Sequence, residues 1–118
     1  MVRPWMGLAL LVALGLWTVG PDGITPAMAD DPISIDVTLK DHRFTPSEIH
    51  VPSGHRADLR IQNQDSTAEE FDSSALKVEK IVPAGTSVIV HLRPLGPGRF
   101  PFMGEFHPDT AQGAVVSD

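Results

Sequence analysis

The sequence predicts an all-β sandwich, and two patterns carry the prediction. Apolar and polar residues alternate in several short runs after residue 30, as they do in strands that bury one face. Turn signals separate these runs at short intervals, which favours a sandwich of strands over a fold of alternating strands and helices. The sequence shows no internal repeat and no second domain, so we expect one domain over residues 30–118.

Three runs show the alternation most clearly. They cover residues 33–39 (ISIDVTL), 57–62 (ADLRIQ) and 88–92 (VIVHL), and each places an apolar side chain at every second position. The turn signals between the runs contain Pro, which fixes φ, and Gly, which permits a positive φ. They are PSG at 52–54, PAG at 83–85 and PLGPG at 94–98.

One segment departs from this pattern. Residues 64–80 (QDSTAEEFDSSALKVEK) are polar, rich in small and acidic residues, and lack a long alternation. We therefore predict a loop here, with one helical turn near Ser73 to Lys77.

The first 29 residues are typical of a secretory signal peptide. Arg3 supplies a positive charge, residues 6–17 (MGLALLVALGLW) form a short apolar run, and Ala27-Met28-Ala29 fits the small-residue cleavage rule. The apolar run is shorter than the roughly 20 residues that span a bilayer, so a cleaved signal is favoured over a membrane anchor. We expect a periplasmic protein that does not insert into the membrane after cleavage.

Composition excludes several kinds of protein. The chain has no cysteine, so neither a disulfide nor a thiolate metal site is available. The formal net charge of −6 argues against nucleic acid as a partner. No glycine-elbow serine, phosphate-binding glycine loop or H-E-x-x-H motif is present, so the sequence favours a binding protein over an enzyme without deciding the matter.

Two separated stretches resemble the cupredoxin superfamily. Residues 41–71 (DHRFTPSEIHVPSGHRADLRIQNQDSTAEEF) resemble its opening strands, with an F-x-P segment, a VPSG turn and a strand that ends in Asn-x-Asp. Residues 94–116 (PLGPGRFPFMGEFHPDTAQGAVV) resemble its closing hairpin and ligand loop. The segments E-E-F and E-K at Glu69 to Phe71 and Glu79-Lys80 are similar to EfeO-type cupredoxin-like domains of bacterial iron uptake systems. The resemblance implies a Greek-key sandwich of about seven strands.

The sequence departs from the superfamily at the copper ligands. A blue-copper site uses two His, one Cys and a weak axial ligand such as Met. In this chain the resemblance places Glu69 at the first His and Gly104 at the Cys, whereas His107 matches the second His. Residues 111–113 stand in the axial region and contain no Met. These departures argue against a blue-copper electron carrier.

Glu69 and His107 are the leading candidates for metal ligands. If Phe71 packs in the core, strand alternation places Glu69 on the same face and turns Glu70 away. His107 lies in a short loop before Pro108, where a neutral imidazole can be held as a ligand. The alternative for His107 is a side chain that only caps the turn.

Glu79 and Met103 complete the candidate set. Glu79 is included through the resemblance, and its alternative is a surface ion pair. Met103 is expected to face outward unless the strand bends at Gly104, so it is either a ligand or a surface side chain. Glu105 has a weaker case. We expect the remaining histidines at structural or exposed positions, with His42 an outside candidate: His42, His50, His55 and His91.

Carboxylates with one imidazole suit Fe²⁺, Mn²⁺, Zn²⁺ or Cu²⁺ better than Cu⁺. With the resemblance, they lead us to expect an exported metal-binding protein for iron or copper that serves a membrane iron uptake system. Its partner would be a membrane iron permease or another periplasmic metal carrier. Two alternatives stay open: a copper-dependent redox accessory that oxidises ferrous iron, and a metal-free β-sandwich interaction module.

Overall fold

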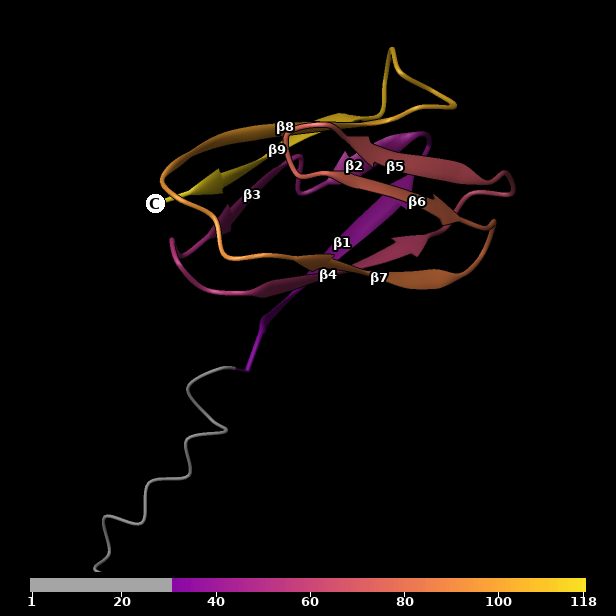
Figure 1. Cartoon of the computed structure of the whole chain (residues 1–118). Coiled ribbons are helices and arrows are strands. Elements are labelled where there is room, and N and C mark those ends of the chain that lie inside the picture. The colour runs from indigo at the N-terminus through magenta and orange to yellow at the C-terminus, as the bar shows by residue number, and fades with distance from the viewer. Residues whose placement is uncertain (1–30) are drawn as a thin grey trace, which may run out of the picture.

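Two β-sheets packed face to face make up the part of the chain that the structure describes, residues 31–118 (Figure 1). The coordinates are a computed structural model of the chain. The predicted signal peptide, residues 1–29, lies outside the described residues. Within residues 31–118 there is no helix, and therefore none long and apolar enough to cross a membrane.

Both sheets are mixed. The four-stranded sheet has the order β2-β1-β4-β7, in which β1 and β4 pair in parallel, and the five-stranded sheet has the order β3-β9-β8-β5-β6, in which β3 and β9 pair in parallel. The nine strands are β1 (Ile33–Lys40), β2 (Arg43–Thr45), β3 (Glu48–Val51), β4 (Ala57–Asn63), β5 (Glu69–Ser73), β6 (Val78–Val82), β7 (Ser87–Leu92), β8 (Gly98–Gly104) and β9 (Gln112–Ser117).

The all-β prediction is confirmed. The three alternating runs of the sequence correspond to β1, β4 and β7, which lie side by side in the four-stranded sheet. The described residues contain nine strands rather than about seven, and two of these, β2 and β3, have only three and four residues. Short strands of this kind carry too few residues to show an alternation in the sequence.

The prediction of a loop over residues 64–80 is wrong. From Glu69 onward this segment forms the antiparallel pair β5 and β6. In the turn that joins them, Lys77 has a positive φ of 58°, and its amide donates a hydrogen bond to the carbonyl of Ser74. The sequence of β5 shows no alternation of apolar and polar residues, because polar side chains occupy two of its inward positions. Both Glu69 and Ser73 are buried, and the Ser73 hydroxyl donates a hydrogen bond of 2.7 Å to the carbonyl of Pro101.

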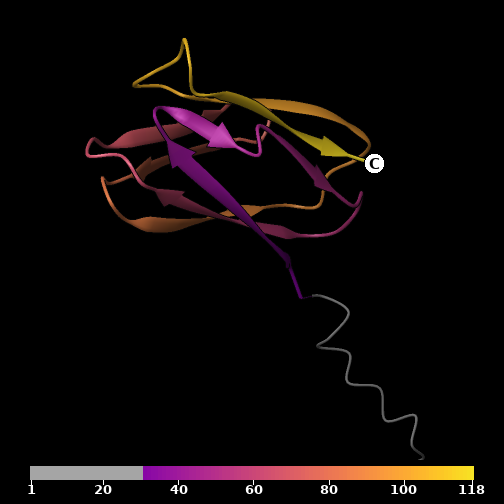
Figure 2. The ribbon, with the colours of Figure 1, turned by 180° about the vertical axis from the view of Figure 1, so that it is seen from behind.

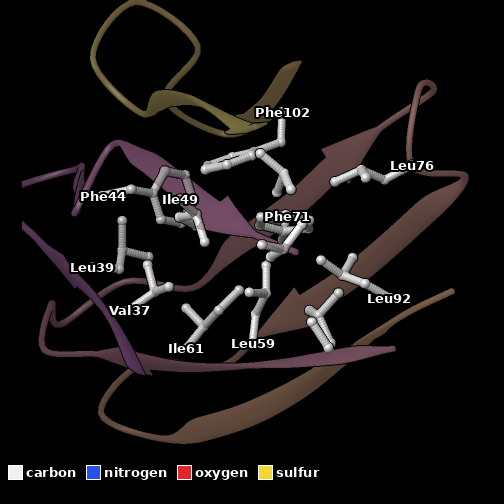
Figure 3. Packing of buried hydrophobic residues seen from close by; sticks show 14 of the residues in the cluster. Val37, Leu39, Phe44, Ile49, Leu59, Ile61, Phe71, Leu76, Leu92 and Phe102 are labelled. Carbon is white, nitrogen blue, oxygen red and sulfur yellow. The ribbon is translucent and has the colours of Figure 1, made fainter. Parts of the chain in front are cut away.

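The core lies between the two sheets, and three aromatic rings occupy its upper part (Figure 3). Phe71 from β5 and Phe102 from β8 have ring centroids 4.8 Å apart. Phe44 from β2 meets both rings edge to face, at 5.9 and 5.2 Å. Edge contacts of this kind suit the quadrupoles of aromatic rings. They tie β2, which follows the β1–β2 turn, to β5 and β8 of the other sheet.

Two connections meet at one end of the sandwich. Figures 1 and 2 view the molecule from opposite sides, and in both the turn between β1 and β2 lies near the projecting loop between β8 and β9. Glu69, the first residue of β5, lies at the same end, close to both connections. The fold therefore gathers polar side chains from three distant parts of the sequence.

Packing between the sheets predicts unequal effects for two conservative substitutions. Ile61 on β4 is fully buried, whereas Ile89 on β7 is 47% exposed. We expect Ile61→Val to lower the free energy of unfolding by about 1 kcal/mol, because it removes a buried methylene. Ile89→Val should change it by less than about 0.5 kcal/mol. Thermal denaturation of both variants measures the difference, and equal losses would contradict this placement of the core.

Candidate metal centre

Three side chains that can bind a metal come together at this end of the sandwich. They are His42 from the β1–β2 turn, Glu69 from the start of β5 and His107 from the β8–β9 loop, and their ligand atoms all lie within 4.8 Å of one another. The shortest contact joins His107 Nδ1 to Glu69 Oε2 at 2.6 Å. The predicted pair Glu69 and His107 is thus in direct contact.

Glu69 is the buried member of this group. Its side chain is 1% exposed, and burial of a carboxyl group is costly unless hydrogen bonds replace its water. Oε1 accepts the backbone amides of Glu70 at 3.0 Å and Phe106 at 2.8 Å. Oε2 is left to face His107. Both oxygens of this carboxyl group therefore have partners, and the two amides orient the side chain.

Gly104 provides the space that Glu69 occupies. A Cβ atom at position 104 would lie 2.5 Å from Glu69 Cδ, 2.8 Å from Glu69 Oε1 and 2.7 Å from Ala111 Cβ. The resemblance to cupredoxins described above implies that position 104 corresponds to the cysteine of a blue-copper site. The carboxyl group of Glu69 has thus taken the space that a side chain at this position would need. A side chain at this position therefore requires Glu69 and Ala111 to move.

His107 is held by the backbone of its own loop. Its amide donates to the carbonyl of Gly104 at 3.1 Å, and its carbonyl accepts the amide of Ala111 at 2.9 Å. Its side chain is 28% exposed, so one edge of the ring reaches solvent. The ring of His42 stacks on it with a centroid distance of 3.6 Å and an interplanar angle of 11°.

From the sequence, His42 was expected at a structural or exposed position and was only an outside candidate for a ligand. The structure instead places it beside Glu69 and His107. The structure places it in the two-residue turn between the paired residues Lys40 and Arg43, with φ of 56° after Asp41 with φ of 51°. Such a turn usually contains glycine or asparagine. A histidine at this position is the signal that could have identified it.

Asp65 supports this turn. One carboxyl oxygen accepts the amide of Asp41 at 2.7 Å, and the other accepts the amide of His42 at 3.0 Å. Burial alone would raise the pKa of Asp65, but these two donors and the imidazoles of His42 and His107 outweigh it and hold the pKa below its usual value.

The structure does not bring Glu79 and Met103 to this group. Both neighbour Asp72 on the outer face of the five-stranded sheet, where Glu79 is exposed and Met103 is 43% exposed. Glu70 faces the same side, as strand alternation predicted, while Glu69 faces inward. Partial burial raises the pKa of Glu70, and the nearby carboxyl group of Glu105 raises it further.

The geometry and chemistry of the three side chains fit a divalent metal ion. Ligand atoms bound at about 2.1 Å lie about 3.0 Å apart when adjacent and about 4.2 Å apart when opposite. The ligand atoms of the group lie within 4.8 Å of one another, close to these spacings. The stacked rings of His42 and His107 have to turn apart for both to point a nitrogen at one ion. Two imidazoles with one carboxylate suit Cu²⁺, and with open positions they also suit Fe²⁺. None of the three side chains offers the sulfur that Cu⁺ prefers.

Comparison with known proteins identifies the family. The profile of the Cupredoxin-like domain family matches residues 8–117. The chain belongs to this family. It is also 41% identical to the uncharacterized protein RP394 of Rickettsia prowazekii (strain Madrid E) over 97 residues, which cover 82% of this chain and 74% of that protein.

Solved structures of copper proteins share the fold. Auracyanin A, a blue copper protein from Chloroflexus aurantiacus, matches with a TM-score of 0.62 at 15% identity. The matched region covers 75% of this cupredoxin-like chain and 100% of the auracyanin chain. The metal-binding domain of the Cu(I)-exporting P-type ATPase CopA from Streptococcus pneumoniae D39 also has a TM-score of 0.62, at 13% identity, with coverages of 72% and 84%. At these identities the likeness shows the fold alone.

The contact between Glu69 and Gly104 predicts the effect of adding one methyl group. We expect Gly104→Ala to lower the free energy of unfolding by about 1–3 kcal/mol, because the new Cβ has no room beside Glu69 and Ala111. Gly96→Ala is the matched control, since a Cβ there meets nothing within 4 Å. Chemical denaturation of both variants tests this, and a Gly104→Ala variant as stable as the control would contradict the close approach.

Proposed function

We propose that this chain is an exported cupredoxin-like protein that binds Cu²⁺ through His42, Glu69 and His107. The observation that carries the proposal is the buried carboxyl group of Glu69, aimed at two imidazoles by backbone amides. Nitrogen and oxygen donors of this kind bind Cu²⁺ more tightly than other divalent first-row metals. The solved copper proteins of the same fold support copper as the metal.

The arrangement suits capture and release of an ion. His42 and His107 are partly exposed, whereas Glu69 is buried, so an ion would meet the imidazoles at the surface and the carboxylate beneath them. Only three protein ligands are available in the group, which leaves coordination positions for water or for a ligand from a partner. A bound Cu²⁺ would supply a charge and an exchangeable coordination shell, and we propose carriage of the ion as the role.

We also propose where the protein acts and which partner it serves. The apparent signal peptide supports a periplasmic location, and the resemblance to EfeO-type domains supports a link to iron uptake, with a membrane iron permease or a periplasmic metal carrier as partner. Iron itself is supported by that resemblance and by the two-His, one-carboxylate donor set, which Fe²⁺ also accepts. Cu²⁺ is favoured as the bound ion by its higher affinity for such donors.

Metal titration with single variants tests the site. Cu²⁺ at one hundred times its Kd should stabilise the protein by about 2.7 kcal/mol, because the ion binds the folded state. We expect Glu69→Gln and His107→Ala each to weaken Cu²⁺ binding at least ~10-fold. The matched control is Glu70→Gln, which removes a carboxylate from the outer face and should change little. Isothermal titration calorimetry measures all three.

Two outcomes would count against this site. A thermal midpoint that does not move with Cu²⁺ or Fe²⁺ would favour a metal-free interaction module, in which Glu69 and His107 form only an ion pair. Equal losses for Glu69→Gln and Glu70→Gln would place the ion on the outer face instead.

Binding of Cu²⁺ should weaken as the pH falls. Both His42 and His107 coordinate only as neutral imidazoles, so protons compete with the metal in the range where imidazole becomes charged. Titrations from pH 8 to pH 5 would show the loss. An affinity that stays constant over this range would exclude the two histidines as ligands.

A further inference from the structure

The turn that carries His42 has a backbone conformation that suits glycine better than histidine. Lys40 pairs with Arg43, so Asp41 and His42 are the two central residues of a hairpin turn, with φ of 51° and 56°. A turn with two positive φ values is easiest for Asn-Gly, Asp-Gly or Gly-Gly, so Asp41 suits its position. His42 stands where glycine would fit without steric cost. Conformations of this kind persist where surrounding groups hold them, and they point to a use for the side chain.

Asp65 is the group that holds this turn. Its Oδ1 accepts the amide of Asp41 at 2.7 Å, and its Oδ2 accepts the amide of His42 at 3.0 Å. Asp65 is itself fixed, because its amide donates to Asn63 Oδ1 at 2.9 Å. Asn63 is 1% exposed, and its Nδ2 donates to the carbonyls of Thr67 and Val82 at 2.9 and 3.1 Å. The turn is therefore anchored to the buried end of β4.

The same carboxyl group also orients the imidazole of His42. Oδ2 of Asp65 lies 3.4 Å from His42 Nδ1, so this nitrogen faces Asp65, and Nε2 is the nitrogen that remains for a metal. The ring then lies flat against His107 at 3.6 Å. Carboxylates that approach one nitrogen of a histidine in this way decide which nitrogen is free for a metal.

We propose that Asp65 is a positioning residue of the metal site, which presents His42 as the third protein ligand. Without its two hydrogen bonds the turn would lose the contacts that hold His42 at a positive φ, and the site would keep only Glu69 and His107. Asp65 does not touch the ion and acts through His42. This inference rests on the proposed Cu²⁺ site.

The test compares Asp65→Asn with a matched control, Asp58→Asn. An amide keeps the size of the side chain but has one acceptor oxygen, so one of the two turn amides loses its partner. Asp58 also contacts a histidine, His91, at 2.7 Å, but this pair lies across β4 and β7 and is not part of the group formed by His42, Glu69 and His107. We expect Asp65→Asn to weaken Cu²⁺ binding about 10- to 100-fold and Asp58→Asn to leave it unchanged.

Electron paramagnetic resonance of the Cu²⁺-loaded protein shows whether Asp65 positions His42 or only stabilises the fold. Nitrogen couplings should report two imidazoles in the unaltered protein and in Asp58→Asn, but one in Asp65→Asn. A residue that only stabilised the fold would lower the thermal midpoint of the metal-free protein and leave the number of nitrogen ligands at two. Two imidazoles in Asp65→Asn would overturn the inference.

His42→Gly provides a second variant that should fold well. Glycine adopts a positive φ without steric cost, so the thermal midpoint of the metal-free protein should rise by a few degrees while Cu²⁺ affinity falls. Asp65→Asn should then cause no further loss of affinity when combined with His42→Gly. A further loss as large as that in the unaltered protein would overturn the inference.

The variants distinguish this inference from the function on which it rests. If Glu69→Gln and His107→Ala bind Cu²⁺ as tightly as the unaltered protein, the metal site fails, and the role of Asp65 fails with it. If those two variants lose affinity while Asp65→Asn does not, only the role of Asp65 is overturned.

Discussion

The buried carboxyl group of Glu69 is the feature on which the candidate site depends. Removal of a carboxyl group from water is costly, and it is tolerated here because both oxygens have hydrogen-bond partners within 3.0 Å. One of these partners is the amide of Phe106, so Glu69 also ties the β8–β9 loop to the start of β5. Loss of this carboxyl group would therefore affect both the donor set and the position of the loop that carries His107.

The aromatic core connects the other part of the site to this carboxyl group. Phe44 follows the β1–β2 turn by two residues and packs on Phe71, which follows Glu69 by two residues. The same side-chain packing that joins the two sheets thus sets the distance between His42 and Glu69. The side chains of the site lie in a turn, a loop and the first residue of a strand, but the packing of the core sets the distances between them.

Strand alternation predicted the parts of the site that depend on local geometry. It placed Glu69 inward with Phe71, Glu70 outward, and Met103 outward beside Phe102, and the structure agrees in each case. It did not find β5 as a strand, because Glu69 and Ser73 occupy positions where the pattern expects apolar residues. It could not place Glu79, which was included through a resemblance and lies on the outer face.

The position of His42 could not be predicted from the residues that surround it in the sequence. Its position depends on a carboxyl group 23 residues away in the sequence and on a ring stacked from the opposite sheet. Neither contact leaves a spacing that can be recognised in the chain. The local sign was a histidine in a turn that usually contains glycine, and this sign becomes clear only once the flanking strands are known to pair.

The fit between Glu69 and Gly104 also bears on how such a protein can change in evolution. In this backbone a Cβ at position 104 has no room while Glu69 and Ala111 keep their present places. A chain that loses the glutamate first gives up the hydrogen bonds that Glu69 accepts from the amides of Glu70 and Phe106. A side chain at position 104 therefore goes together with a change at Glu69 and Ala111, although the chain shares its fold with a blue copper protein.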